Sequence, residues 1–185
     1  KKKEKSMKIN IKQNSVKLLI AAGMVVGTAS ISAAAEEMDI SATVGEACMV
    51  TVPSGLDFGD YDGIIDNATD ALVASFSVNA HCSLNTSGVI NIDPGQNASN
   101  SDTALPARTM KMENVAGTYN LNYNLYKDSG YSNIWGAGTL VDVGSGNPHT
   151  GTGSSEVVSG FAEIPAGQIV PDGIYQDTVT VTVLY

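Results

Sequence analysis

The C-terminal segment GIYQDTVTVTVLY, residues 173–185, restricts the fold more than any other part of the chain. Valines alternate with threonines along it, so one side of an extended strand would carry Tyr175, Asp177, Val179, Val181, Val183 and Tyr185. Alternation of β-branched residues over this length is typical of a half-buried β-strand. The pattern continues to residue 185, and we therefore expect a strand that is either paired or at a sheet edge where another strand can be added.

The N-terminal segment has the three parts of a secretory signal peptide. Residues 7–17 are basic, residues 18–31 are apolar or small, and residues 33–35 form an A-x-A cleavage site. The apolar run is short and rich in glycine, serine and alanine, which disfavours the alternative of an uncleaved membrane anchor. We therefore expect residues 1–35 to be a leader that is removed on export.

Charge is strongly segregated along the chain. Seven of the ten basic residues lie before residue 18, so residues 36–185 carry three basic side chains against 18 acidic ones, a net charge of −15. Such a surface repels phosphate backbones and anionic lipids, and we expect neither a nucleic-acid partner nor membrane insertion of the mature chain. These 150 residues suit one domain with a substantial core.

The chain has two cysteines, Cys48 and Cys82. In an oxidising compartment we expect them to form one disulfide, and the closed loop of about 35 residues would contribute roughly 3.5–4 kcal/mol on the chain-entropy model. The alternatives are two free thiols or a metal pair, but two cysteines without nearby histidine spacing make a poor zinc site.

Short alternating segments recur along residues 38–185, separated by glycine, asparagine, aspartate and proline. They are residues 38–44, 47–52, 75–82, 88–92, 119–126, 156–164 and the C-terminal strand. Residues 93–106 and 142–156 have the composition of surface loops. With no convincing long amphipathic helix, this pattern predicts an all-β, antiparallel β-sandwich.

Several motifs then occur in a characteristic order: Cys48, Leu56–Tyr61, His81–Cys82, Arg108, Leu121–Asp128, Trp135–Gly138, Ile164–Gln168, Gly173–Asp177 and the valine–threonine strand ending in Tyr185. In order and spacing they resemble spore coat protein U domains, the family that includes subunits of archaic chaperone–usher (Csu-type) pili. The resemblance covers essentially all of residues 38–185. No one motif is decisive, but an unrelated sandwich would not share all of them.

The resemblance implies an incomplete immunoglobulin-like sandwich that is completed by a donor strand from another chain. A periplasmic chaperone would fill the resulting groove first, and the N-terminal extension of the next subunit would fill it later. In this chain the extension would be residues 36–47, and the pilin domain would be residues 48–185. The implied donor side chains are Met38, Ile40, Ala42 and Val44. The implied groove side chains are Val179, Val181, Val183 and Tyr185. The alternative for the extension is a disordered tail.

The expected function is that of a structural subunit of a bacterial surface pilus, or fimbrium, that supports adhesion and biofilm formation. The implied partners are other pilin subunits, a periplasmic chaperone and an outer-membrane usher. One alternative is a spore or cell coat protein that uses the same domain without an usher. Another is a tip or adaptor subunit, although an adhesin would be expected to carry a second, receptor-binding domain.

Catalysis and metal binding find little support in the sequence. His81 is expected to face solvent beside the disulfide and His149 to lie in a glycine- and serine-rich loop, and neither has the signature of a positioned base. Within the acidic stretch from Asp57 to Asp70, residues 60–63 faintly resemble a calcium loop but lack the remaining ligand positions and the final glutamate of an EF-hand. We therefore expect no enzyme activity, no metal and no cofactor.

Three aromatic residues could instead form a sugar-binding patch: Tyr126, Tyr131 and Trp135. Core and cross-strand packing is the role that we expect for them.

Overall fold

The computed structural model describes residues 36–112 and 119–185, and the leader predicted for residues 1–35 lies outside them. The chain divides into two units between Ala42 and Thr43. Residues 36–42 have no regular secondary structure, and the second unit contains every strand of the described residues. Within the described ranges, no helix is long and apolar enough to cross a membrane.

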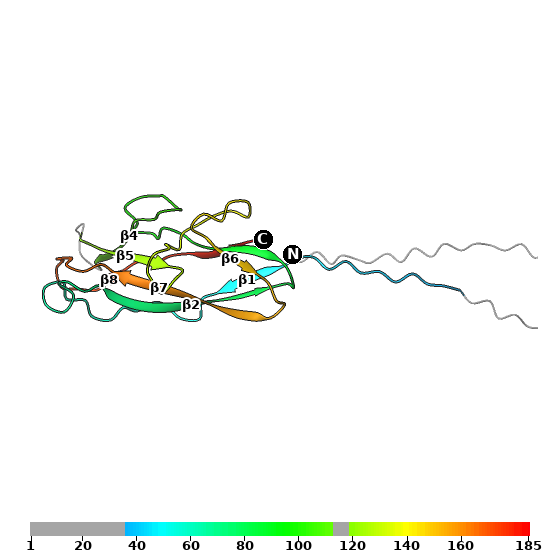
Figure 1. The fold of residues 1–185 in the computed structure, drawn as a ribbon, viewed down its shortest axis with the longest axis horizontal. Helices are drawn as coiled ribbons and strands as arrows, with labels where there is room; N and C mark the ends of the chain where they lie inside the picture. The colour runs from blue at the N-terminus through cyan, green and yellow to red at the C-terminus, as the bar shows by residue number, and fades with distance from the viewer. Residues whose placement is uncertain (1–35, 113–118) are drawn as a thin grey trace, which may run out of the picture. The chain divides into compact units, whose positions relative to one another are not determined.

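The described part of the second unit is built from β-strands alone (Figure 1). The strands are β1 (Cys48–Thr51), β2 (Leu72–Cys82), β3 (Ser87–Ile92), β4 (Arg108–Met112), β5 (Asn120–Tyr126), β6 (Asn147–Thr150), β7 (Ser155–Ile164), β8 (Tyr175–Gln176) and β9 (Val181–Leu184). One sheet has six strands in the order β1-β2-β7-β5-β4-β8, and the other has three in the order β6-β3-β9. Every pairing is antiparallel, so the predicted all-β antiparallel sandwich is confirmed.

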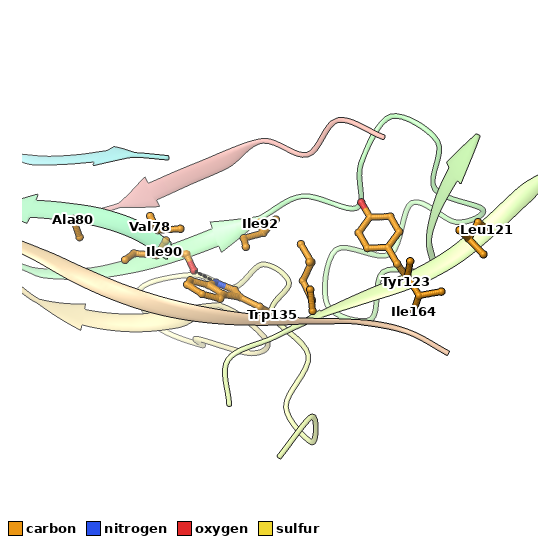
Figure 2. Packing of buried hydrophobic residues seen from close by; sticks show 10 residues of the cluster. Val78, Ala80, Ile90, Ile92, Leu121, Tyr123, Trp135 and Ile164 are labelled. Atoms are coloured by element: carbon orange, nitrogen blue, oxygen red, sulfur yellow. Dashed lines mark hydrogen bonds between the residues drawn. The ribbon is translucent and has the colours of Figure 1, made fainter. Parts of the chain in front are cut away.

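The core lies between the two sheets and includes the fully buried Trp135. Its indole Nε1 donates a hydrogen bond of 2.9 Å to the carbonyl oxygen of Ile90, which Figure 2 shows as a dashed line. Its ring stacks on Phe76 with the centroids 5.8 Å apart. Alternate residues of β2, β5 and β7 supply most of the rest: Val78, Ala80, Leu121, Tyr123, Leu125, Ala162 and Ile164. Burying a large aliphatic or aromatic side chain contributes about 1.5–3 kcal/mol, so this layer holds the sheets together.

β3 is covered on both faces, and its last five residues are therefore all buried. One face turns to the core, and residues 136–146 pack over the other. The side-chain amide of Asn91 donates to the carbonyl oxygen of Gly138 at 3.1 Å, while its oxygen accepts the Gly138 N–H at 3.0 Å. Gly146 permits this packing because a Cβ there would collide with the side chains of Val89 and Asn91.

The C-terminal segment is divided between the two sheets. β8 pairs with β4 at the edge of the larger sheet, and β9 pairs with β3 at the edge of the smaller one (red in Figure 1). The alternation predicted one strand over residues 173–185, whereas residues 177–180 lie outside the regular strands. The backbone hydrogen bonding of a regular strand is interrupted there, because the Thr180 N–H donates to the side-chain oxygen Oδ1 of Asp93, at 2.9 Å, and not to a backbone carbonyl group.

Two strands were not predicted. β4, with the sequence RTMKM, has few residues that favour strands, and β6 contains Pro148, which an edge strand tolerates. The prediction that residues 142–156 form only a surface loop was therefore wrong, because His149 lies in β6. Its imidazole Nε2 lies 3.3 Å from Glu156 Oε2, although the two atoms are not aligned as a hydrogen bond. Residues 38–44, in contrast, form no strand.

Candidate functional site: a groove beside the C-terminal segment

An apolar cavity of about 450 Å3 borders the C-terminal segment. Residues 52–58, which follow β1, and residues 175–181 contribute to its lining, although they are far apart in the sequence. The remaining lining comes from side chains of β2, β3, β4 and β5: Phe76, Ile92, Met110, Tyr123 and Leu125. These belong to the core cluster or pack against it, so the cavity is a part of the core that this domain leaves unfilled.

A second cavity of about 700 Å3 adjoins the first. The two share four lining side chains, which are Leu56, Phe58, Met110 and Tyr175. The second cavity continues along residues 168–174 and along the acidic loop at residues 57–64. Together the two cavities form one elongated groove, which is called the groove below.

One edge of the C-terminal segment is hydrogen-bonded along its length. The carbonyl oxygens of Thr178 and Thr180 accept hydrogen bonds from the backbone N–H groups of Gln96 and Asp93, each at 3.0 Å. β8 extends this pairing along β4 and β9 extends it along β3. The segment is therefore anchored through its even-numbered residues.

The opposite edge of the segment has no partner strand among the described residues, because the smaller sheet ends at β9. Successive residues of a strand direct their backbone groups to opposite edges, so Val179, Val181 and Val183 present theirs at this unpaired edge. The side chains of the same three residues pack against the core, and two of them, at positions 179 and 181, line the groove. An unpaired edge beside an apolar groove has the geometry to bind one further strand.

β1 is the terminal strand of the larger sheet and has a free edge of its own in the described structure. A disulfide joins Cys48 of β1 to Cys82 of β2 at directly opposite positions, with the Cα atoms 4.0 Å apart. β1 also approaches β9 here, since Gly88 lies beside both the Cys48 sulfur and the Val183 side chain. The disulfide therefore anchors β1 beside the C-terminal segment.

A buried arginine holds the loop against which the C-terminal segment pairs. Arg108, on β4, is 1% exposed. Its guanidinium donates hydrogen bonds of 2.8–3.2 Å to backbone carbonyl oxygens of Ile92, Asp93 and Trp135. Burial lowers the pKa of Arg108 to about 10, and the nearby groups Tyr123, Asp93 and Asp177 oppose this shift. The Arg108 side chain thus links the end of β3 to the backbone at Trp135 by hydrogen bonds.

Tyr123 and Asp177 connect β5 to the C-terminal segment. The Tyr123 hydroxyl donates to Asp177 Oδ2 at 2.7 Å, and Asp177 Oδ1 accepts the Asn97 N–H at 3.0 Å. Figure 2 shows the Tyr123 hydroxyl directed toward the loop that follows Ile92. Burial raises the pKa of Tyr123 well above its usual value, and the hydrogen bond to Asp177 raises it further.

The structure places the residues predicted for strand exchange in two different settings. Val179 and Val181 line the groove, Val183 packs beside it, and Tyr185 is 52% exposed and lines neither cavity. The predicted donor side chains are exposed throughout, with Met38 at 79%, Ile40 at 84% and Val44 at 91%, and Ala42 is exposed as well.

Two of the residues predicted for an acceptor groove, Val179 and Val181, line the first cavity, whereas the residues of its floor were not predicted to lie there. Phe76 and Tyr123 lie in segments predicted to be strands, but nothing in their alternation indicated that the space beside them stays open. Leu56 and Phe58 were noted only as part of a motif. Proximity of these residues depends on pairings between strands distant in sequence, which periodicity does not report.

The other candidate residues have structural roles. Asp62 accepts hydrogen bonds from the backbone N–H groups of Ile64 and Ile65, and no group of three potential metal ligands occurs in the described ranges. Tyr131 packs edge-on against Tyr126 and Phe161, with centroid distances of 5.6 and 6.4 Å. These aromatic contacts fit the packing role expected for them.

Comparison with known proteins identifies the family. The model of the Spore Coat Protein U domain matches residues 34–182 of the chain. The chain belongs to the Spore Coat Protein U family. Protein U of Myxococcus xanthus is 33% identical to this chain over 186 aligned residues. The alignment covers 93% of this chain and 99% of Protein U.

A solved structure shares the fold of this Spore Coat Protein U domain. It is the CsuC–CsuE chaperone–tip adhesion subunit pre-assembly complex from the archaic chaperone-usher Csu pili of Acinetobacter baumannii, with a TM-score of 0.52 and 21% sequence identity. The match covers 77% of this chain and 40% of the length of that solved chain. At this identity the likeness concerns the fold.

Proposed function

We propose that this protein is a structural, non-enzymatic subunit of a bacterial surface pilus of the chaperone–usher type. The observation that carries the proposal is the unpaired edge at Val179, Val181 and Val183 beside an apolar groove. A strand from another chain would pair with this edge and place alternate side chains in the groove. The CsuC–CsuE complex, which has this fold and comes from chaperone-usher pili, supports the same reading.

The donor strand in this proposal is the N-terminal extension, residues 36–47. Met38, Ile40, Ala42 and Val44 recur at every second position, so that all four can face a groove from one strand. Moving them from water into the groove contributes several kcal/mol, at about 25 cal/mol per Å2 of apolar surface. The exposure of these side chains in the single chain is what an unengaged donor strand requires.

A chain with a groove and a donor strand assembles head to tail. Such contacts generate an open filament when the rotation between subunits does not close a ring. In this proposal a periplasmic chaperone occupies the groove first, an outer-membrane usher then exchanges it for the next subunit, and the pilus supports adhesion and biofilm formation. The leader predicted at residues 1–35 would direct export to the periplasm.

Deletion of residues 36–46 tests the donor assignment. The shortened subunit should still be captured by the chaperone but should build no fibres, which electron microscopy of the secreted fraction would show. Val181→Asp should prevent chaperone capture because it places a charge in the groove, whereas Thr182→Asp, on the exposed face of β9, is the matched control. Fibres from the deletion variant, or an undiminished periplasmic yield of Val181→Asp, would contradict the proposal.

A coat protein is the second candidate, favoured by the name of the Spore Coat Protein U family. It would use the same strand addition without an usher. Genes for a chaperone and an usher next to this one would favour the pilus, and a coat location by immunogold labelling would favour the coat. A tip or adaptor position remains within the pilus proposal and would be recognised by labelling at fibre ends.

A further inference from the structure

Asp177 is the one acidic residue that lines the first cavity, whose other lining residues are apolar or uncharged. An ionised carboxylate in such a place is costly once a strand covers it, because water is then excluded from its oxygens. In the uncovered domain the groove is open and Asp177 is only half-buried. Strand addition would therefore take away the water that still reaches this carboxylate in the single chain.

Two donors from within the domain already reach both oxygens of Asp177. The Tyr123 hydroxyl lies 2.7 Å from Oδ2, and the backbone N–H of Asn97 lies 3.0 Å from Oδ1. Gly95 lets the loop come this close, since its φ is +93° and a Cβ there would collide with the carboxylate. Tyr123 is 5% exposed and also lines the cavity, so its hydroxyl is held beneath the incoming strand.

We propose that Tyr123 is a positioning residue that makes the groove acceptable to an apolar donor strand by satisfying Asp177 in advance. The inference rests on the proposed function, since it concerns the same groove. Without the hydroxyl, Oδ2 would still be hydrated in the uncovered domain but would lose its partner when a strand covers it. Loss of the hydroxyl therefore weakens strand binding more than it weakens the domain.

The test measures binding of a labelled peptide with the sequence of residues 36–47 to the chain of residues 36–185. Tyr123→Phe should weaken the affinity about 10- to 100-fold, the range for leaving a buried polar group unpaired, with a much smaller change in the urea midpoint of the peptide-free protein. Tyr126→Phe is the matched control, because Tyr126 lies on the same strand but lines neither cavity. It should leave the affinity unchanged.

A double-mutant cycle separates this role from a general packing effect. Asp177→Asn removes the charge, so Tyr123→Phe in that background should weaken binding by no more than about threefold. An equal loss in both backgrounds, or an equal loss of affinity and stability in Tyr123→Phe, would overturn the inference and leave the groove intact.

If Tyr123→Phe fails to fold, Asp177→Asn alone decides: an affinity within about threefold of the original supports the inference, and a tenfold loss refutes it. Failure of the unmodified chain to bind the peptide would instead refute the donor assignment, and the inference with it.

Discussion

At the residue scale, a few buried polar groups fix the geometry of an otherwise apolar sandwich. Arg108 is buried without a direct carboxylate partner, and its Nε and one terminal nitrogen donate to three backbone carbonyl groups. Its planar fork of donors suits this arrangement, which a lysine could not reproduce. Tyr123 and Asp177 act together in the same region. These side chains decide where the loop after β3 lies, and through it the course of the C-terminal segment.

The raised pKa of Tyr123 predicts alkaline destabilisation. In the unfolded chain a tyrosine loses its proton near pH 10, whereas folded Tyr123 keeps it to higher pH. The folded state then binds one proton more, so this stabilisation is complete below pH 10 and declines above it by about 1.4 kcal/mol per pH unit. Urea unfolding at pH 8 and at pH 11 should show a smaller decline in Tyr123→Phe than in the unmodified chain. Equal declines would contradict the assignment.

At the element scale, the groove exists because three strands are only partly paired. β9 is an edge strand of the smaller sheet, β1 is an edge strand of the larger sheet, and β8 is the other edge strand of the larger sheet, where it carries the C-terminal segment. Most unpaired edges in soluble proteins are shortened, charged or covered. Here the exposed edge at β9 is uncharged and valine-rich, which is unfavourable for an isolated domain and favourable for one that binds a strand.

The disulfide gives a prediction at this scale. Cys48→Ala/Cys82→Ala should lower the free energy of unfolding by about 3–4 kcal/mol, since the bond closes a loop with a sequence separation of 34 residues. Chemical denaturation of the double variant and of the oxidised chain would measure the difference. Because β1 is anchored by this bond, the variant should also bind the peptide of residues 36–47 more weakly. An unchanged unfolding midpoint would show that strand pairing alone holds β1.

At the scale of the whole molecule, the domain has a core with an unfilled part, of which the first cavity measures about 450 Å3. Packed interiors have few voids larger than a water molecule, so this groove reduces the stability of the single chain. A strand that binds in the groove would pair with the backbone edge at Val179, Val181 and Val183, and its side chains would fill the unfilled part of the core. In the proposed filament, stability would thus be a property of the assembled chain of subunits.

Ligand-linked stabilisation follows from the same reasoning. At a concentration 100 times its dissociation constant, the peptide of residues 36–47 should raise the free energy of unfolding by about 2.7 kcal/mol. A thermal melt with increasing peptide would show a concentration-dependent rise in Tm. A peptide in which Ile40 and Ala42 are replaced by aspartate is the control and should have no effect. A Tm that does not respond to the unmodified peptide would contradict donation by this segment.

The sequence by itself determined the local patterns: the alternating segments that form β2, β5 and β7, the pairing of the two cysteines, and the alternation of valine with threonine along residues 178–183. Side chains two positions apart share a face of any strand, so such patterns can be read without knowledge of partners. The tertiary structure alone decided that β4 and β6 are strands, that the C-terminal segment changes sheets, and that Phe76, Tyr123 and Asp177 meet at one groove. Each of these depends on contacts between segments distant in the chain, and periodicity carries no information about which strand lies beside which, or where a place in the sheet remains open.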